Sequence, residues 1–190
     1  MKVETIEDND EVLKVELSEA NDAVANALRR SMMVKVPTLA IKHIEVSKND
    51  SGLFDEVLAN RIGQIPFTIP QNVEGEDEVH IAVKKEGPVD VVAGEIQADN
   101  DEAEPVNPET VLVTLKEGQE LELEGVAVLN TGDEHAKHQG GTVGYEKTGE
   151  GTYEFRIEST SGYSNKELFN TAVEKVLEEI HEFEEEVEDL

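Results

Sequence analysis

The chain has 190 residues, with 44 acidic against 16 basic side chains and a formal net charge of -28. This length fits one domain or two small interleaved domains, and it is long enough to bury a core. The charge excludes phosphate binding by most of the surface, because such a surface repels nucleic acid and anionic membranes. We interpret the acidity as a hydrated, halophile-like surface. The alternative, a disordered chain, is less favoured because the apolar residues recur in regular periods.

Cysteine is absent from the sequence. This excludes disulfide bonds, thiolate catalysis and cysteine-ligated metal sites, and it is consistent with a cytoplasmic protein. Residues 1–10 are acidic and contain no apolar run, so no signal peptide is expected. No apolar segment approaches the roughly 20 residues of a membrane helix, so no membrane association is expected either.

The first third of the chain predicts a strand, a helix and a second strand. Residues 12–17 alternate as in a half-buried strand, and residues 18–21 supply helix-capping residue types. The helix predicted over 22–34 has an apolar stripe that includes Leu28 and Met32, and Pro37 lies beyond its end. The following strand, 39–46, changes the phase of its alternation near His43, which predicts a bulge.

The middle of the chain predicts a short helix followed by strands. Helical spacing covers residues 53–62, and Gly63 fits a C-terminal cap. Acidic or glycine-rich loops are expected over 98–108 and 130–144. The predicted strands are 79–83, 89–96, 111–115, 121–129 and a final strand at about 153–157.

The last predicted helix, 165–190, has an apolar stripe along its whole length. A helix this long has too little domain beneath it to cover the stripe, so part of the stripe is expected to form an interface. An ordinary core helix is the alternative. The stripe consists of Leu168, Phe169, Ala172, Val173, Val176, Leu177, Ile180, Phe183 and Val187.

Three of the four arginines lie in two short segments, as Arg29, Arg30 and Arg61. In so acidic a chain, adjacent arginines at a helix end are a local reversal of sign. Guanidinium groups bind carboxylates or backbone carbonyls in bidentate geometry, which favours a protein-docking role. The alternatives are two solvated side chains for the first pair and a structural salt bridge for Arg61.

Several of these segments in combination resemble the D subunit of archaeal DNA-directed RNA polymerase. That family is related to the third-largest subunit of eukaryotic RNA polymerase II and to the bacterial alpha N-terminal domain. The resemblance runs nearly from end to end. It is carried by Ala25-Asn26-Ala27-Leu28-Arg29-Arg30, Val36-Pro37, Leu58-Ala59-Asn60-Arg61-Ile62-Gly63-Gln64-Ile65-Pro66, the segment 115–123, Gly132-Asp133-Glu134-His135-Ala136-Lys137 and the acidic final helix.

The resemblance implies an α+β fold with a discontinuous dimerisation domain, a sheet plus two amphipathic helices. This domain is expected over residues 1–47 and 150–190, with an inserted, mostly-β domain over 48–149. It further implies a heterodimer with subunit L, whose interface is formed by Leu28, Met32, Phe169, Val173, Val176, Leu177 and Ile180. Arg29, Arg30 and Arg61 are then expected to dock the second-largest polymerase subunit, and small platform subunits complete the assembly.

The sequence shows no phosphate-binding glycine loop, nucleophile elbow or histidine–glutamate zinc motif. No catalytic residue is therefore expected, and the function implied is a non-catalytic assembly subunit for transcription. The polar segment 71–77 stands where many members of the resembled family carry a cysteine-bearing iron–sulfur module. We therefore expect an iron–sulfur-free variant without a cofactor. The spacing of His135 and His138 is compatible with a metal site, but we favour a structural loop there.

Two alternatives remain open from the sequence. One is a homodimeric assembly subunit of the bacterial-alpha type, which the lack of a C-terminal DNA-binding domain makes less favoured. The other, from a different class, is a small acidic enzyme with an unrecognised site. A direct DNA-binding module conflicts with the charge.

Overall fold

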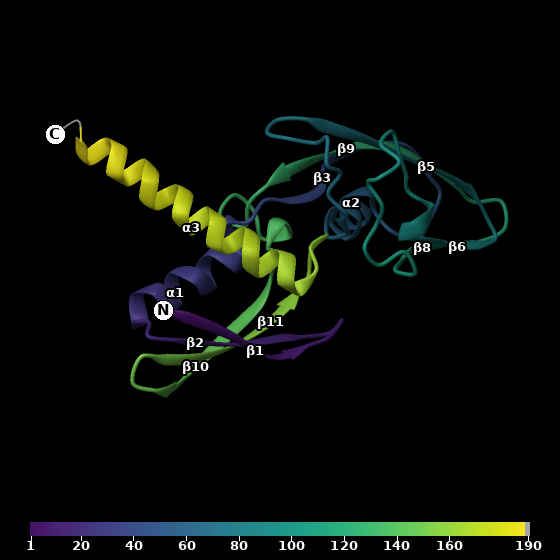
Figure 1. Cartoon of the computed structure of the whole chain (residues 1–190). Coiled ribbons are helices and arrows are strands. Elements are labelled where there is room, and N and C mark those ends of the chain that lie inside the picture. Colours follow the sequence, from purple (N-terminus) through teal and green to yellow (C-terminus); the bar gives the residue numbers. More distant parts are fainter. Residues whose placement is uncertain (189–190) are drawn as a thin grey trace. The chain divides into compact units, whose positions relative to one another are not determined.

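A computed structural model describes residues 1–188 and divides the chain into two compact units. The first unit comprises Met1–Pro37 and Thr131–Leu190, and the second, Thr38–Asn130, is inserted between them. This arrangement confirms the α+β class with an inserted β-rich domain (Figure 1). The end of the last helix, expected at Leu190, lies outside the described residues.

The boundaries between the units differ from the expected ones at 47/48 and 149/150. Strand β3 (Thr38–Asn49) belongs entirely to the second unit, because it pairs with β9 (Glu120–Asn130) along its whole length. Strand β10 (Gly141–Gly149) belongs to the first unit, because it pairs with β11 (Thr152–Ser159). Both observed boundaries therefore follow from pairing between strands that are far apart in the sequence.

The sheet of the first unit has four antiparallel strands in the order β1-β2-β11-β10. Strands β1 (Lys2–Asp8) and β10 were not expected from the sequence. Strand β1 is exposed along nearly its whole length, so it lacks the apolar alternation of a half-buried strand. Strand β10 contains three glycines, which weaken the strand pattern. The expected strand 12–17 is observed as β2 (Leu13–Ser18).

Both long helices of this unit lie on the same side of the sheet (Figure 1). Helix α1 (Asp22–Arg30) begins at Asn21, whose side chain accepts a hydrogen bond from the Val24 amide. It continues into a five-residue π-helical turn, Ser31–Lys35. Helix α3 (Asn165–Glu188) begins with a capping box, in which the side chains of Ser164 and Glu167 each accept a hydrogen bond from the other's backbone amide. The hydrogen bonds that Ser164 donates hold the pKa of Glu167 below its usual value.

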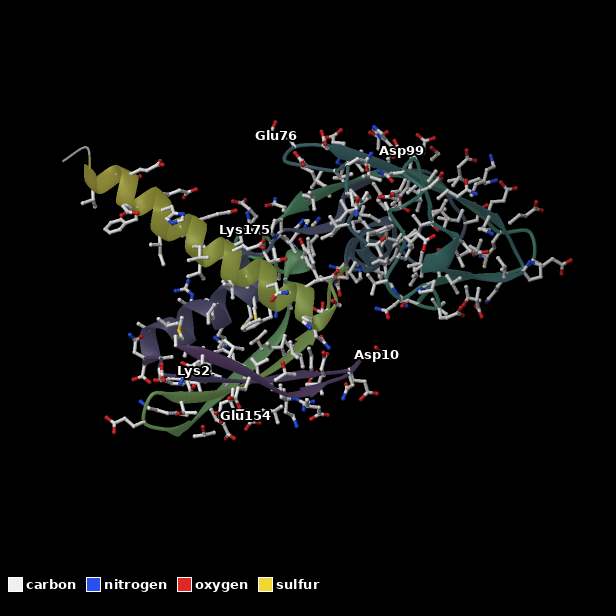
Figure 2. All side chains as sticks on the ribbon, in the orientation of Figure 1. Lys2, Asp10, Glu76, Asp99, Glu154 and Lys175 are labelled. Atoms are coloured by element: carbon white, nitrogen blue, oxygen red, sulfur yellow. The ribbon has the colours of Figure 1, made fainter. Side chains whose placement is uncertain are left out.

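The outer face of the sheet carries a row of four glutamates, one on each strand. In register, Glu4 lies opposite Glu16, Glu16 opposite Glu154, and Glu154 opposite Glu146. Figure 2 shows Glu154 directed away from the helices. Like charges in directly opposed positions destabilise a sheet, so this row is a built-in electrostatic cost of the first unit.

Asp22, in the first turn of α1, joins that helix to the sheet. It accepts hydrogen bonds from the Tyr153 hydroxyl at 2.7 Å and the Lys147 ammonium at 3.1 Å. The hydrogen bond from Tyr153, followed by the contact with Lys147, lowers the pKa of Asp22. Because the pKa is lower in the folded state, the stabilisation is complete above the unfolded-state pKa and is lost as the pH falls through the folded-state value.

We therefore expect acid to weaken the attachment of α1 to the sheet. For Asp22→Asn, the free energy of unfolding should fall at neutral pH and become less dependent on pH below about 4. Chemical denaturation of both proteins across that pH range measures this difference. If the free energy of unfolding of the Asp22→Asn protein depends on pH as that of the wild type does, Asp22 is not the group responsible.

The second unit packs a five-stranded sheet, in the order β4-β3-β9-β5-β7, against a helix and a two-stranded ribbon. The bulge expected near His43 is confirmed by a register shift between Ile41 and His43 in β3. Gly125 lies opposite this region, where a Cβ atom would be 2.6 Å from the His43 carbonyl oxygen. The remaining sheet strands are β4 (Pro66–Phe67), β5 (Glu78–Glu86) and β7 (Gln97–Ala98).

Helix α2 (Asp55–Gly63) covers this core through Leu58 and Ile62, which are completely buried. The ribbon consists of β6 (Val89–Val92) and β8 (Val111–Leu115). The strand expected over 89–96 ends at Val92, because a short 3-10 helix, Ala93–Glu95, follows it. A second short 3-10 helix, Ala136–His138, belongs to the first unit.

The segment 71–77 forms a compact turn on the second unit. Val73 inserts into the core. The Asn72 side chain accepts a hydrogen bond from the Asn100 side chain at 3.0 Å, and the Gln71 amide donates to the Glu102 carboxylate at 3.3 Å. The short polar link is therefore an integral part of the unit.

Candidate functional site: an uncovered helix face

The apolar stripe of α3 is covered at its start and uncovered towards its end. Leu168 and Ala172 are completely buried against the rest of the first unit. Further along, Leu177 is 50% exposed, Ile180 55% and Phe183 66%. Figure 1 shows the second half of α3 extending past α1. The stripe thus runs from the core of this unit onto an open surface, as its length predicted.

One side of α3 forms the wall of an apolar groove of about 630 Å³. Leu17, Val24 and Leu28 line this groove from the sheet and α1, and Val3 of β1 lines it together with the preceding residue, Met1. The lining residues that α3 supplies are Phe169, Asn170, Val173, Glu174, Val176, Leu177 and Ile180. A groove of this lining fits the apolar face of an amphipathic helix.

A second groove, of about 620 Å³, lies between α1 and the other side of α3. Its apolar lining includes Val176, Ile180 and Phe183, and its polar lining includes Arg30 and Lys35. Val176 and Ile180 therefore line both grooves, which places them on the crest of the exposed stripe.

Six of the seven residues expected at a dimer interface line the first groove, and Met32 does not. Met32 is 0% exposed and belongs to the core beneath the helices. Met32 lies in the π-helical turn that begins at Ser31, and both of these residues are buried. The Ser31 hydroxyl also donates a buried hydrogen bond of 2.9 Å to the Ala172 carbonyl. Met32 thus supports the helix pair from within and offers no surface to a partner.

The three arginines expected at a docking face have different environments. The Arg29 Nε–H donates to the Val143 carbonyl at 3.1 Å, so this side chain satisfies an acceptor of β10. Arg61 lies in the second unit, where its Nη2 donates to the Val111 carbonyl at 3.0 Å. Arg30 is exposed, and within residues 1–188 it has neither a hydrogen bond nor an ion pair through its guanidinium.

An ionic cluster that no sequence pattern indicates fixes α3 against the turn after α1. The Lys35 ammonium lies 3.0 Å from the Asp133 carboxylate and 3.2 Å from the Glu179 carboxylate. These two acids, Asp133 first, raise the pKa of Lys35. The cluster joins three segments distant in sequence, so only the fold could reveal it.

The loop 130–144 packs against the start of α3. A Cβ atom at Gly140 would lie 2.5 Å from the Met32 carbonyl oxygen, and one at Gly141 would lie 2.7 Å from a methyl group of Leu168. In this loop, His138 is buried, and the His135 Nδ1 accepts a hydrogen bond from the Lys137 amide. Throughout the described chain, no three histidine or carboxylate side chains are grouped as metal ligands would be.

Among residues 1–188, no helix has the combination of length and apolar composition needed to cross a bilayer.

Comparison with known proteins relates the chain to RNA polymerase subunits. Residues 52–145 match the family described as the RNA polymerase Rpb3/RpoA insert domain. DNA-directed RNA polymerase subunit Rpo3 of Natronomonas pharaonis is 44% identical over 124 residues, which are 65% of this chain and 50% of that protein.

Two further Rpo3 subunits extend the comparison. The Pyrococcus furiosus subunit is 37% identical over 153 residues, 77% of this chain and 59% of the relative. The Halobacterium salinarum subunit is 37% identical over 144 residues, 75% of this chain and 58% of the relative. The chain therefore spans between half and three-fifths of the length of these relatives. It is similar to archaeal Rpo3 subunits over most of its own length and contains a match to the Rpb3/RpoA insert domain.

Proposed function

We propose that this protein is a non-catalytic assembly subunit of an archaeal DNA-directed RNA polymerase and acts in transcription in the cytoplasm. The observation that carries this proposal is the uncovered apolar face of α3, which lines two open grooves. Similarity to Rpo3 subunits supplies the class of complex. The net charge of -28 opposes direct binding of nucleic acid, so the contribution of this subunit is to hold other proteins.

The partner proposed for the α3 face is subunit L, in a heterodimer. Leu28, Phe169, Val173, Val176, Leu177 and Ile180 would contact an amphipathic helix of that subunit. We further propose that Arg30, exposed and unpaired within the described chain, docks the second-largest subunit, as the resemblance implies for the two adjacent arginines. Small platform subunits would then join the complex. Arg29 contributes by holding α1 against β10.

Without cysteine, the chain offers no ligands for a cysteine-bound iron–sulfur cluster. The turn at 71–77, with Val73 in the core, provides a compact alternative to such a module. We therefore propose that the protein works without a cofactor and contributes no catalytic group to the polymerase.

Co-expression with a candidate subunit L tests the proposal directly. Size-exclusion chromatography with mass measurement should detect a one-to-one complex with subunit L. This complex should then bind the large polymerase subunits when they are added. Homodimers in the presence of subunit L would instead favour an assembly subunit of the bacterial-alpha type. A chain that stays monomeric with every polymerase subunit, at low and at molar salt, would overturn the proposal.

A further inference from the structure

The distal segment of α3, which we define as residues 178–187, combines a high density of like charge with little support from the core. Six of its ten residues are glutamates, and it contains neither lysine nor arginine. Its apolar side chains Ile180, Phe183 and Val187 are all exposed, whereas Leu168 near the start of the same helix is completely buried. The core of the first unit therefore holds the beginning of α3 but not the distal segment.

Glu182 lies at the centre of the repulsion within this segment. It has a glutamate four residues away on either side, Glu178 and Glu186, and these share its face of the helix. Glu179 and Glu185, each three residues away, are also its neighbours. Like charges at these spacings destabilise a helix. Four repulsive pairs that share one side chain thus oppose the helical state.

Two ion pairs support the segment, and both lie at its beginning. Glu178 binds Lys175 of the same helix at 2.7 Å, and Glu179 binds Lys35 of the π-helical turn at 3.2 Å. Lys35 also binds Asp133 at 3.0 Å, so its pair with Glu179 ties α3 to the loop after β9. Beyond Glu179, the glutamate side chains of the segment make no hydrogen bond or ion pair with any described residue. Lys35 therefore provides the last ionic attachment of α3.

The spacing of the glutamates makes their repulsion sensitive to salt. Residues three or four apart on a helix lie roughly 5–6 Å from each other. This separation is well within the Debye length of about 30 Å in 0.01 M salt and exceeds the value of about 3 Å in 1 M salt. Salt also weakens the attraction of Glu179 to Lys35, but that is one attraction against four repulsions. Glutamate is itself a good helix former, so screening should favour the helix.

We propose that the distal segment is a salt-dependent helix, which opens locally at low ionic strength and is completed in molar salt. A helix of about ten residues without a packed face is marginal in water, so the repulsion is large enough to decide its state. Ile180, which lines both grooves, lies beyond the Lys35 ion pair, so salt also completes the α3 face. That the completed face binds a partner rests on the proposed function, whereas the salt dependence of the helix does not.

Amide hydrogen exchange followed by NMR on the isolated protein tests this inference, because it measures opening residue by residue. A peptide with the sequence of residues 178–187 supplies the reference exchange rate at each salt concentration, since so short a peptide is largely unfolded. Protection of the amides of the distal segment should be about tenfold higher in molar than in low salt, the change expected when several like-charge pairs are screened.

Three variants separate the local effect from the net charge. Glu182→Gln should raise the protection of the segment at low salt by about fivefold and reduce its salt dependence, because it removes all four pairs centred on that residue. Lys35→Gln should lower the protection, because it removes the attachment at Glu179. Glu150→Gln is the matched control, since Glu150 is an exposed glutamate of the same unit in the turn between β10 and β11. It should leave the protection of the segment unchanged.

Equal protection of the segment at low and at molar salt would overturn the inference, as would wild-type protection in Glu182→Gln. Equal gains from Glu182→Gln and Glu150→Gln would assign the effect to net charge and overturn it as well. Wild-type protection in Lys35→Gln would refute the role of the Lys35 ion pair. No partner is present in these measurements. A negative result would therefore leave the proposed function standing, and failure to bind subunit L would leave this inference standing.

Discussion

Ile180→Asp should weaken binding of subunit L strongly while leaving the isolated protein as stable as the wild type. Ile180 lines both grooves and is 55% exposed, so the substitution removes little buried surface within the chain. In the complex, the new carboxylate would be buried among apolar side chains without a partner, at a cost of about 3 kcal/mol. That cost corresponds to a loss of affinity of roughly 150-fold. Isothermal titration calorimetry gives the affinity, and thermal unfolding should give the same melting temperature for both proteins.

Ile6→Asp is the matched control for this experiment. Ile6 lies on β1 of the same unit, is 53% exposed, and lines neither groove. The same chemical change there should leave the affinity for subunit L unchanged. If Ile180→Asp binds subunit L with wild-type affinity, the α3 face is not the dimer interface. If both variants lose affinity equally, added charge rather than the α3 face is responsible.

The elements whose apolar residues recur at regular helical or strand spacing were predictable from the sequence. Helix α3 was recognised because its stripe is continuous, and the bulge in β3 because the alternation changes phase near His43. Strand β1 was missed because it is exposed, and β10 because its glycines resemble loop composition. The unit boundaries depend on which strands pair, and that pairing is set by contacts between residues far apart in sequence.

The exposed face of α3 was predictable from the sequence, but the environment of each residue on it was not. Helical spacing places Leu28 and Met32 on one stripe and both belong to the core cluster, but only Leu28 also lines the first groove. Charge alone could not separate Arg29, held by a β10 carbonyl, from Arg30, which has no such partner among the described residues. The Lys35 cluster depends on packing, and no local pattern indicates it.

Glu16→Lys should stabilise the first unit at low salt, although it alters an exposed face of the sheet. Glu16 lies in register between Glu4 and Glu154, so the substitution converts two repulsive cross-strand pairs into attractive ones. Each such pair contributes up to about 1 kcal/mol, so we expect the melting temperature to rise by about 3 °C. In molar salt the Debye length shrinks to about 3 Å, and the difference between the two proteins should nearly vanish.

The wild type should itself become more stable as salt is added, because screening relieves both this row and the net charge of -28. Glu11→Lys separates the two effects, since it makes the same change in charge outside the glutamate row. It should raise the melting temperature at low salt less than Glu16→Lys does. Equal increases from the two variants would assign the salt dependence to net charge alone. A wild-type protein equally stable at low and at molar salt would show that its acidity is not a burden that salt relieves, and the halophile-like interpretation would then be wrong.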